Sequence, residues 1–118
     1  MKIYIVKPNF VSPDAIWFAK KELEKEFPGC KFLENQSGPK FIRDMVKHCD
    51  MLAIAVDESL QVGKGVYSEY EYVRDNNVPM RLFMYKEKQR EVVQTDKFLI
   101  TVTDPENYRY YAKVSAIF

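Results

Sequence analysis

A run of six consecutive apolar residues, MLAIAV at 51–56, limits the possible folds of this chain more than any other feature. A strand without polar side chains must bury both of its faces, as a central strand does in a parallel sheet that has helices on each side. Asp57 follows the run, and a loop that contains Gly63 and Gly65 leads to a helix predicted over 66–74. Open α/β sheets bind their ligands in such loops, outside the carboxyl ends of the strands. This stretch therefore predicts both the centre of a sheet and a binding site beside it.

Strand and helix patterns alternate along the rest of the chain. Strands are predicted at Lys2–Val6, Cys30–Leu33, Met51–Val56, Met80–Tyr85 and Phe98–Val102. Helices are predicted from Ser12-Pro13 to about Phe27, from Pro39 to about Lys47, from Val66 to Arg74, and over a short last segment that Asp104-Pro105 caps and that contains Tyr108, Tyr110 and Tyr111. The alternation predicts an α/β fold, a flavodoxin-like or Rossmann-like three-layer sandwich whose five-stranded parallel sheet has the order 2-1-3-4-5. The 118 residues contain no linker or repeat, so we expect a single domain over 1–118.

Composition narrows the range of functions. The net charge is only +1, which gives no reason to expect binding to a nucleic acid polymer. No apolar run reaches the roughly 18 residues of a membrane span, and the first residues lack the apolar stretch of a signal peptide. Cys30 and Cys49 do not have metal-site spacing, and His48 is the single histidine. We therefore expect a cytoplasmic protein with reduced thiols and without a metal, a cofactor or a membrane partner.

Several residues of ligand-binding type converge on one edge of the predicted sheet. Lys7 and Phe10 follow the first strand, Asp57 ends the third, and Gly63-Lys64-Gly65 precedes the helix that carries Glu69. The glycines would let the backbone approach a phosphate or a sugar, with Lys64 as a counter-charge. Plainer explanations exist for each residue, because glycines form tight turns, Asp57 can simply end a strand, and the helix dipole favours an acid in the first turn. Their convergence, rather than any one residue, indicates a site.

Four segments along the chain form a pattern. A strand followed by a proline and an aromatic residue opens the chain, IYIVKPNF at 3–10. An apolar strand that ends in an aspartate comes next, CDMLAIAVD at 49–57, and then a glycine-containing turn with a helix-borne glutamate, GKGVYSE at 63–69. Val78-Pro79 precedes the following strand. This pattern, which covers most of the chain through short motifs, resembles the nucleoside 2-deoxyribosyltransferase family and its relatives, the deoxynucleoside-monophosphate glycosidases.

The resemblance implies a reaction and roles for three residues. In the family, the helix glutamate attacks the anomeric carbon of a 2-deoxyribosyl group, and a second base or water then accepts the sugar. An aligned carboxylate stabilises the oxocarbenium-like transition state and can then bond to it. By resemblance Glu69 would be the nucleophile, Asp57 a ligand of the sugar or base, and Tyr4 a pocket wall that hydrogen-bonds near the nucleophile. The ligand would be a nucleoside, a nucleotide or a related ribosyl compound.

Two other functions are compatible with the same residues. Gln61-Val62 precedes Gly63 where the family usually has an aspartate, and Lys7 and Lys64 suit a phosphate better than an uncharged nucleoside. The first alternative is therefore a catalytically inactive module that binds a nucleotide or a nucleotide-derived signal in the same cleft. The second is an interaction protein whose tyrosines contact a partner.

The aromatic residues also predict an assembly. Tyr67, Tyr70 and Tyr72 crowd one helix, which can bury only about half of its circumference, so at least one of them should point away from its own core. The segment Asn107–Phe118 is rich in tyrosine and ends in Ala116-Ile117-Phe118. Members of the family commonly complete their pockets with a neighbouring subunit. We expect a homodimer or a higher even oligomer, with the third helix or the C-terminal tail in the interface.

Overall fold

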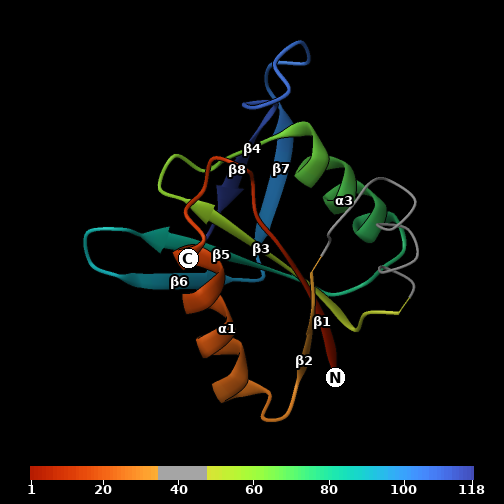
Figure 1. Ribbon diagram of the computed structural model, residues 1–118. Helices are drawn as coiled ribbons and strands as arrows, with labels where there is room; N and C mark the ends of the chain where they lie inside the picture. The colour runs from red at the N-terminus through yellow and green to blue at the C-terminus, as the bar shows by residue number, and fades with distance from the viewer. Residues whose placement is uncertain (35–47) are drawn as a thin grey trace.

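The computed structural model describes residues 1–34 and 48–118 (Figure 1). Its elements are β1 (Lys2–Val6), α1 (Asp14–Glu26), β2 (Lys31–Leu33), β3 (Met51–Asp57), β4 (Gln61–Val62), α3 (Lys64–Asp75), β5 (Met80–Lys86), β6 (Glu91–Thr95), β7 (Phe98–Val102) and β8 (Ala112–Ala116). The helix predicted from Pro39 to about Lys47 lies outside the described residues. Each helix in residues 1–34 and 48–118 is too short or too polar for a membrane span.

The main sheet contains five strands in the order β2-β1-β3-β5-β6. The first four are parallel, and β1 and β3 are neighbours with Ile3 opposite Met51 and Val6 opposite Ile54. The predicted adjacency of the first and third strands and the predicted order of the first four are thereby confirmed. The apolar run at 51–56 is buried throughout, as a central strand requires.

The prediction of a fifth parallel strand at Phe98–Val102 is wrong. The edge position belongs to β6, which is antiparallel to β5, with Lys86 opposite Glu91 and Leu82 opposite Thr95. Residues 87–90 form the turn of a β-hairpin, in which Arg90 adopts a positive φ of 50°. So short a connection cannot carry a crossover, and it forces the antiparallel direction.

Phe98–Val102 is a strand, β7, but it belongs to a second sheet with the order β4-β8-β7. Both pairings in that sheet are antiparallel. The short helix predicted after Asp104-Pro105 is also wrong, because the chain makes turns there and returns as β8. Thr103 and Asp104 donate their backbone N–H groups to the carbonyl of Tyr111 at 3.0 and 3.1 Å, which closes the loop at its base.

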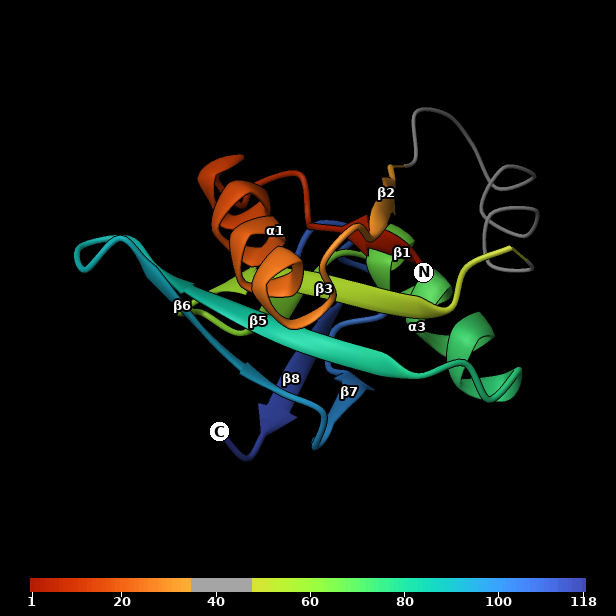
Figure 2. The same ribbon diagram turned by 90° about the horizontal axis from the view of Figure 1, so that it is seen from below.

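Alternate side chains of each strand are buried on opposite faces of the main sheet. Figure 2 shows α1 on one side of this sheet and β7 and β8 on the other. Ile3, Ile5, Ala53, Ala55, Phe83 and Tyr85 pack with Ala15, Ala19 and Leu23 of α1. Tyr4, Val6, Leu52, Ile54, Val56 and Leu82 pack with Val66, Tyr70 and Val73 of α3 and with Ile100, Ala112 and Val114 of the second sheet. The protein is therefore a mixed α/β structure with a mostly parallel five-stranded sheet and a smaller antiparallel sheet. Its candidate site lies on the α3 side.

Candidate functional site

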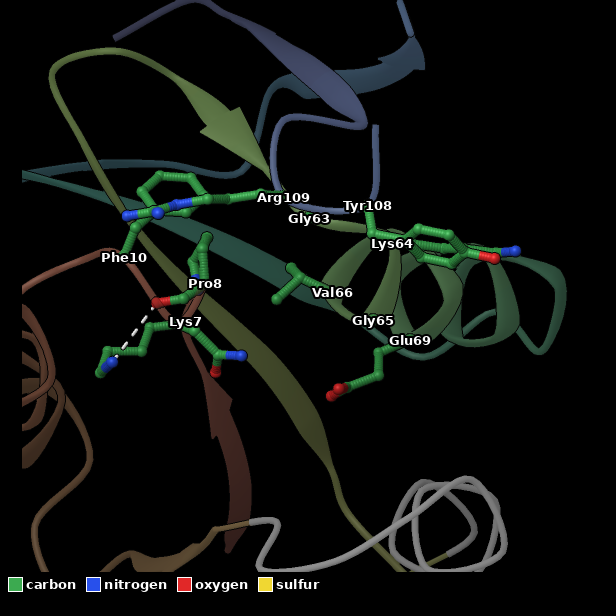
Figure 3. Close-up of a pocket in the computed structure, with 11 residues that line it drawn as sticks. Lys7, Pro8, Phe10, Gly63, Lys64, Gly65, Val66, Glu69, Tyr108 and Arg109 are labelled. Atoms are coloured by element: carbon green, nitrogen blue, oxygen red, sulfur yellow. Dashed lines mark hydrogen bonds between the residues drawn. The ribbon is translucent and has the colours of Figure 1, made fainter. Parts of the chain in front are cut away.

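A cavity of about 570 Å³ opens where the loop after β1 meets the start of α3 (Figure 3). It is lined by Lys7, Pro8, Asn9, Phe10, Gly63, Lys64, Gly65, Val66, Glu69, Tyr108 and Arg109. These residues come from the carboxyl end of β1, from the first turns of α3, and from the loop between β7 and β8. The cavity thus lies outside the carboxyl end of a parallel strand, where open α/β sheets bind ligands.

Glu69 is the buried acid of this cavity. It occupies a position in the apolar stripe Val66, Glu69, Tyr70 and Val73 of α3, and only 6% of its surface is exposed. Burial disfavours the charged form and raises the pKa of Glu69 from 4.5 to about 7, while a hydrogen bond from Tyr4 opposes that rise. Its Oε2 atom lacks a hydrogen-bond partner among the residues that the structure describes. Near neutral pH this carboxyl group can therefore exist in either protonation state.

The start of α3 differs from the prediction. The helix begins at Lys64 rather than Val66, because Gly63 is its N-cap and accepts a hydrogen bond from the N–H of Tyr67 at 3.1 Å. Glu69 consequently lies in the second turn, so the dipole of the first turn does not explain its position.

Gly63 also meets the loop between β7 and β8 at close range. A Cβ at this position would lie 2.9 Å from the carbonyl oxygen of Tyr108, which is closer than real Cβ contacts allow. The N–H of Lys64 donates to that same carbonyl at 2.9 Å. Glycine at 63 therefore permits the loop to fasten onto the start of α3, and this attachment brings Tyr108 and Arg109 into the cavity wall.

Three cationic side chains line the cavity, and each has a different environment. Lys7 Nζ donates to the carbonyl of Pro8 at 3.3 Å, and Lys64 Nζ lies 4.8 Å from the centre of the Tyr108 ring. The Arg109 guanidinium lies 5.6 Å from the centre of the Phe10 ring. Within residues 1–34 and 48–118, none of the three forms an ion pair with a carboxylate. Charge at the cavity wall is therefore predominantly positive.

A second hollow of about 420 Å³ adjoins the first. Its lining is Ile5, Val6, Lys7, Asn9, Pro13, Ile16, Glu34 and Glu69, so it shares Lys7, Asn9 and Glu69 with the first cavity. Glu34 forms an ion pair with Lys20. Glu69 therefore contributes to both hollows, and a ligand that reaches it from one side can extend into the other.

Of the predicted site residues, six line the main cavity: Lys7, Phe10, Gly63, Lys64, Gly65 and Glu69. Tyr4 is fully buried behind Glu69 and acts on its carboxyl group rather than on the open space. Asp57 lines neither hollow. Its Oδ1 accepts hydrogen bonds from the backbone N–H and the hydroxyl of Ser59, as an aspartate does in a turn that follows a strand. The simpler explanation, that Asp57 ends the strand, therefore fits this residue.

The site predicted from the sequence did not include five of the lining residues: Pro8, Asn9, Val66, Tyr108 and Arg109. Asn9 stands beside residues that were predicted, and its place in the loop after β1 was a sufficient signal. Tyr108 and Arg109 fall in the segment predicted as a short helix, whereas they lie in the loop between β7 and β8. The described part of the chain contains no group of three or more His, Cys, Asp or Glu residues that could hold a metal ion.

Comparisons of this chain with protein-family models, with curated proteins and with solved structures found no match.

Proposed function

We propose that this protein binds a nucleoside, a nucleotide or a related ribosyl compound in the Glu69 cavity and cleaves or transfers its N-glycosidic bond. The observation that carries the proposal is a single one. A carboxyl group that is almost fully buried, with one oxygen unpartnered among the described residues, forms part of the wall of a cavity of about 570 Å³. Burying a carboxyl group with one oxygen unsatisfied is costly for folding, and such costs are concentrated at functional sites.

The chemistry requires the ionised form of Glu69. Its carboxylate would attack the anomeric carbon while the bond to the base nitrogen breaks, and the electron pair of that bond leaves with the base, which takes a proton from water. Water or a second base would then attack the anomeric carbon and release the Glu69 carboxylate. The hydroxyl of Tyr4 would hold the carboxyl group in position, because it interacts with Glu69 from the buried side.

The relation to flavodoxin-like three-layer folds is part of the same proposal. Support comes from the parallel order β2-β1-β3-β5 and from the packing of α1 and α3 against opposite faces of the sheet. The antiparallel β6 and the second sheet would be additions to that plan.

A second candidate function is a catalytically inactive module that binds a nucleotide or a nucleotide-derived signal. The specific observation in its favour is the balance of charge in the main cavity, where Glu69 is the single acid among the lining residues that the structure describes and Lys7, Lys64 and Arg109 are cationic. Asp57, which would orient the sugar in an enzyme of the proposed kind, is engaged in a turn instead.

Turnover of a substrate panel tests the proposal. Purified protein is incubated with the 2′-deoxynucleosides and their 5′-monophosphates, with and without an acceptor base, and released base is measured by chromatography. We expect release from at least one compound and its loss in Glu69→Gln, while Glu71→Gln, an exposed neighbour on the same helix, retains it. Full activity in Glu69→Gln would exclude Glu69 as the nucleophile, and binding without turnover across the panel would favour the inactive module.

A further inference from the structure

Arg109 is a cation of the cavity wall whose guanidinium contacts two aromatic rings. Its guanidinium lies 5.6 Å from the Phe10 ring centre and 5.4 Å from that of Tyr110, and those two rings are 4.9 Å apart. Aromatic rings that flank a guanidinium restrict its motion and leave its N–H groups available at the edge of its plane. The side chain is therefore oriented before any ligand arrives.

The backbone that carries Arg109 is also fixed. The Oδ1 atom of Asn107 accepts hydrogen bonds from the N–H of Arg109 at 3.1 Å and from the N–H of Tyr110 at 3.0 Å. The residue before Arg109, Tyr108, is attached to the start of α3 by the hydrogen bond from Lys64. A guanidinium on so constrained a loop loses little conformational freedom when it binds.

Among the described residues, nothing accepts a hydrogen bond from this guanidinium. Within the described part of the chain, Arg109 has ring contacts but neither a carboxylate partner nor an acceptor for its side-chain N–H groups. Lys7 differs, because its ammonium group donates to the Pro8 carbonyl. A planar group with five donors and no acceptor is suited to an oxyanion, which it can bind with two parallel hydrogen bonds.

The geometry points to Arg109 as the binding residue for an oxyanion, a phosphate or a carboxylate, that the ligand of this cavity carries. Figure 3 shows Arg109 and Phe10 on one side of the cavity and the Glu69 carboxyl group on another. The ligand would therefore present its anionic group to Arg109 and its anomeric carbon to Glu69. This inference rests on the proposed function for the ribosyl part of the ligand, but the oxyanion site can be tested by itself.

Calorimetry at pH 7.5 and constant ionic strength tests the inference. The probes are inorganic phosphate, the 2′-deoxynucleosides, their 5′-monophosphates, and 5-carboxy-2′-deoxyuridine, whose anionic group is on the base. We expect one of the two anionic series to bind at least about tenfold more tightly than the matching neutral nucleosides, the order expected of a charge-assisted bidentate hydrogen bond. Whichever series gains affinity identifies the oxyanion as a phosphate on the sugar or a carboxylate on the base.

Three variants assign the effect. Arg109→Gln should abolish the advantage of the anionic probe, and Arg109→Lys should keep only part of it because an ammonium group cannot form the bidentate pair. Arg90→Gln is the matched control, since Arg90 also lies 5.6 Å from a phenylalanine ring centre, that of Phe18, but does not line the cavity. It should leave all affinities unchanged.

The outcomes separate this inference from the proposed function. Equal affinity for anionic and neutral probes, an advantage that persists in Arg109→Gln, or no binding of any probe would overturn the oxyanion site. If neutral nucleosides are cleaved in a Glu69-dependent manner without an anionic preference, the proposed function stands and the oxyanion site falls. If the Arg109-dependent preference is present and no probe is cleaved, the oxyanion site stands and the glycosidic activity falls.

Discussion

At the scale of single residues, the burial of the Glu69 carboxyl group is the feature that most requires a physical explanation. The stripe of α3 to which it belongs is otherwise apolar, and any aliphatic residue of similar size would pack there without the cost of burying a carboxyl group. The interaction with Tyr4 offsets part of that cost, and Oε2 remains unpartnered among the described residues. A stability penalty of this kind at a cavity wall is typical of a functional site.

The raised pKa of Glu69 predicts a specific pH dependence of stability. Because the pKa rises from 4.5 in the unfolded chain to about 7 in the fold, the folded state binds the proton more tightly between these values. This group therefore lowers the free energy of unfolding as the pH increases from about 4.5 to about 7, by roughly 3 kcal/mol in total. Below this pH range Glu69 is protonated in both the folded and the unfolded state. Above it the loss of stability is complete.

Urea denaturation of matched variants across this pH range measures the effect. Glu69→Gln should lack the pH-dependent loss of stability that the carboxyl group causes. The free energy of unfolding of this variant, relative to the parent, should therefore increase with pH up to about 7 and then level off. Glu71→Gln, exposed on the same helix, should follow the parent curve. A difference between Glu69→Gln and the parent that does not vary with pH would contradict the raised pKa.

If Glu69 is the nucleophile, the pH dependence of activity has the opposite direction. The value of kcat/KM should rise with pH through a midpoint near 7, because attack needs the ionised carboxylate. Tyr4→Phe removes a hydrogen bond that lowers the pKa of Glu69, so the midpoint should move to higher pH. Tyr85→Phe, a buried tyrosine on the opposite face of the sheet, is the control and should leave the midpoint in place. A midpoint that Tyr4→Phe does not shift would speak against contact between these two side chains.

At the scale of secondary structure elements, the junction between α3 and the loop after β7 determines the shape of the cavity. Gly63 is in contact with the backbone of Tyr108 and Arg109, whereas a Cβ at Gly65 would meet nothing within 4 Å. Both glycines line the cavity, yet only Gly63 has a steric requirement. The two therefore form a natural pair for an experiment.

Gly63→Ala should destabilise the fold by roughly 1–3 kcal/mol, because the new methyl group forces the loop away from α3 and weakens the hydrogen bond from Lys64 to Tyr108. Gly65→Ala should be neutral or stabilising by up to about 1 kcal/mol, since alanine favours the helix and has open space there. Thermal unfolding of both variants provides the measurement. Equal loss of stability in the two would show that the contact with the loop does not matter.

At the scale of the whole molecule, apolar surface gathers at the C-terminal end of the second sheet. Leu99, Ile117 and Phe118 are exposed by 65%, 73% and 51%. The tyrosines of α3 contribute less than expected, because Tyr70 is buried and Tyr67 and Tyr72 pack partly against the core. Of the two interface elements predicted, the tail is therefore the stronger candidate, and the even-numbered oligomer stays a prediction.

Light scattering at micromolar concentration tests that prediction. We expect a mass of at least twice the 14.0 kDa of one chain and a fall towards 14.0 kDa in Ile117→Ser with Phe118→Ser, because a polar tail loses the apolar contact. Trp17→Ser removes a side chain of α1 that is 55% exposed and should leave the mass unchanged. A parent protein that elutes as a 14.0 kDa monomer would refute the oligomer.

Structural features that depend on residues close together in the chain could be predicted from the sequence. Lys2–Val6 has the predicted bounds, α1 lies inside the predicted helix, and the apolar run at 51–56 is the centre of the sheet. A strand that is buried on both faces must lie in the interior of a parallel sheet. The parallel pairing of β1 with β3 was expected from that position. The convergence of Lys7, Phe10 and Glu69 at one sheet edge was predicted from the same parallel arrangement of strands.

Tertiary structure alone decided the features for which the local pattern permits two outcomes. Five residues such as FLITV pair equally well with a parallel or an antiparallel neighbour, and the β6 hairpin, by occupying the edge beside β5, directed Phe98–Val102 to the second sheet. Asp57 and Glu69 are both acids that the sequence places at the same sheet edge, but only Glu69 lies on the buried face of α3, where burial raises its pKa. Arg109 meets Phe10 from the opposite end of the chain because β8 returns beside β4, a pairing that no local pattern contains.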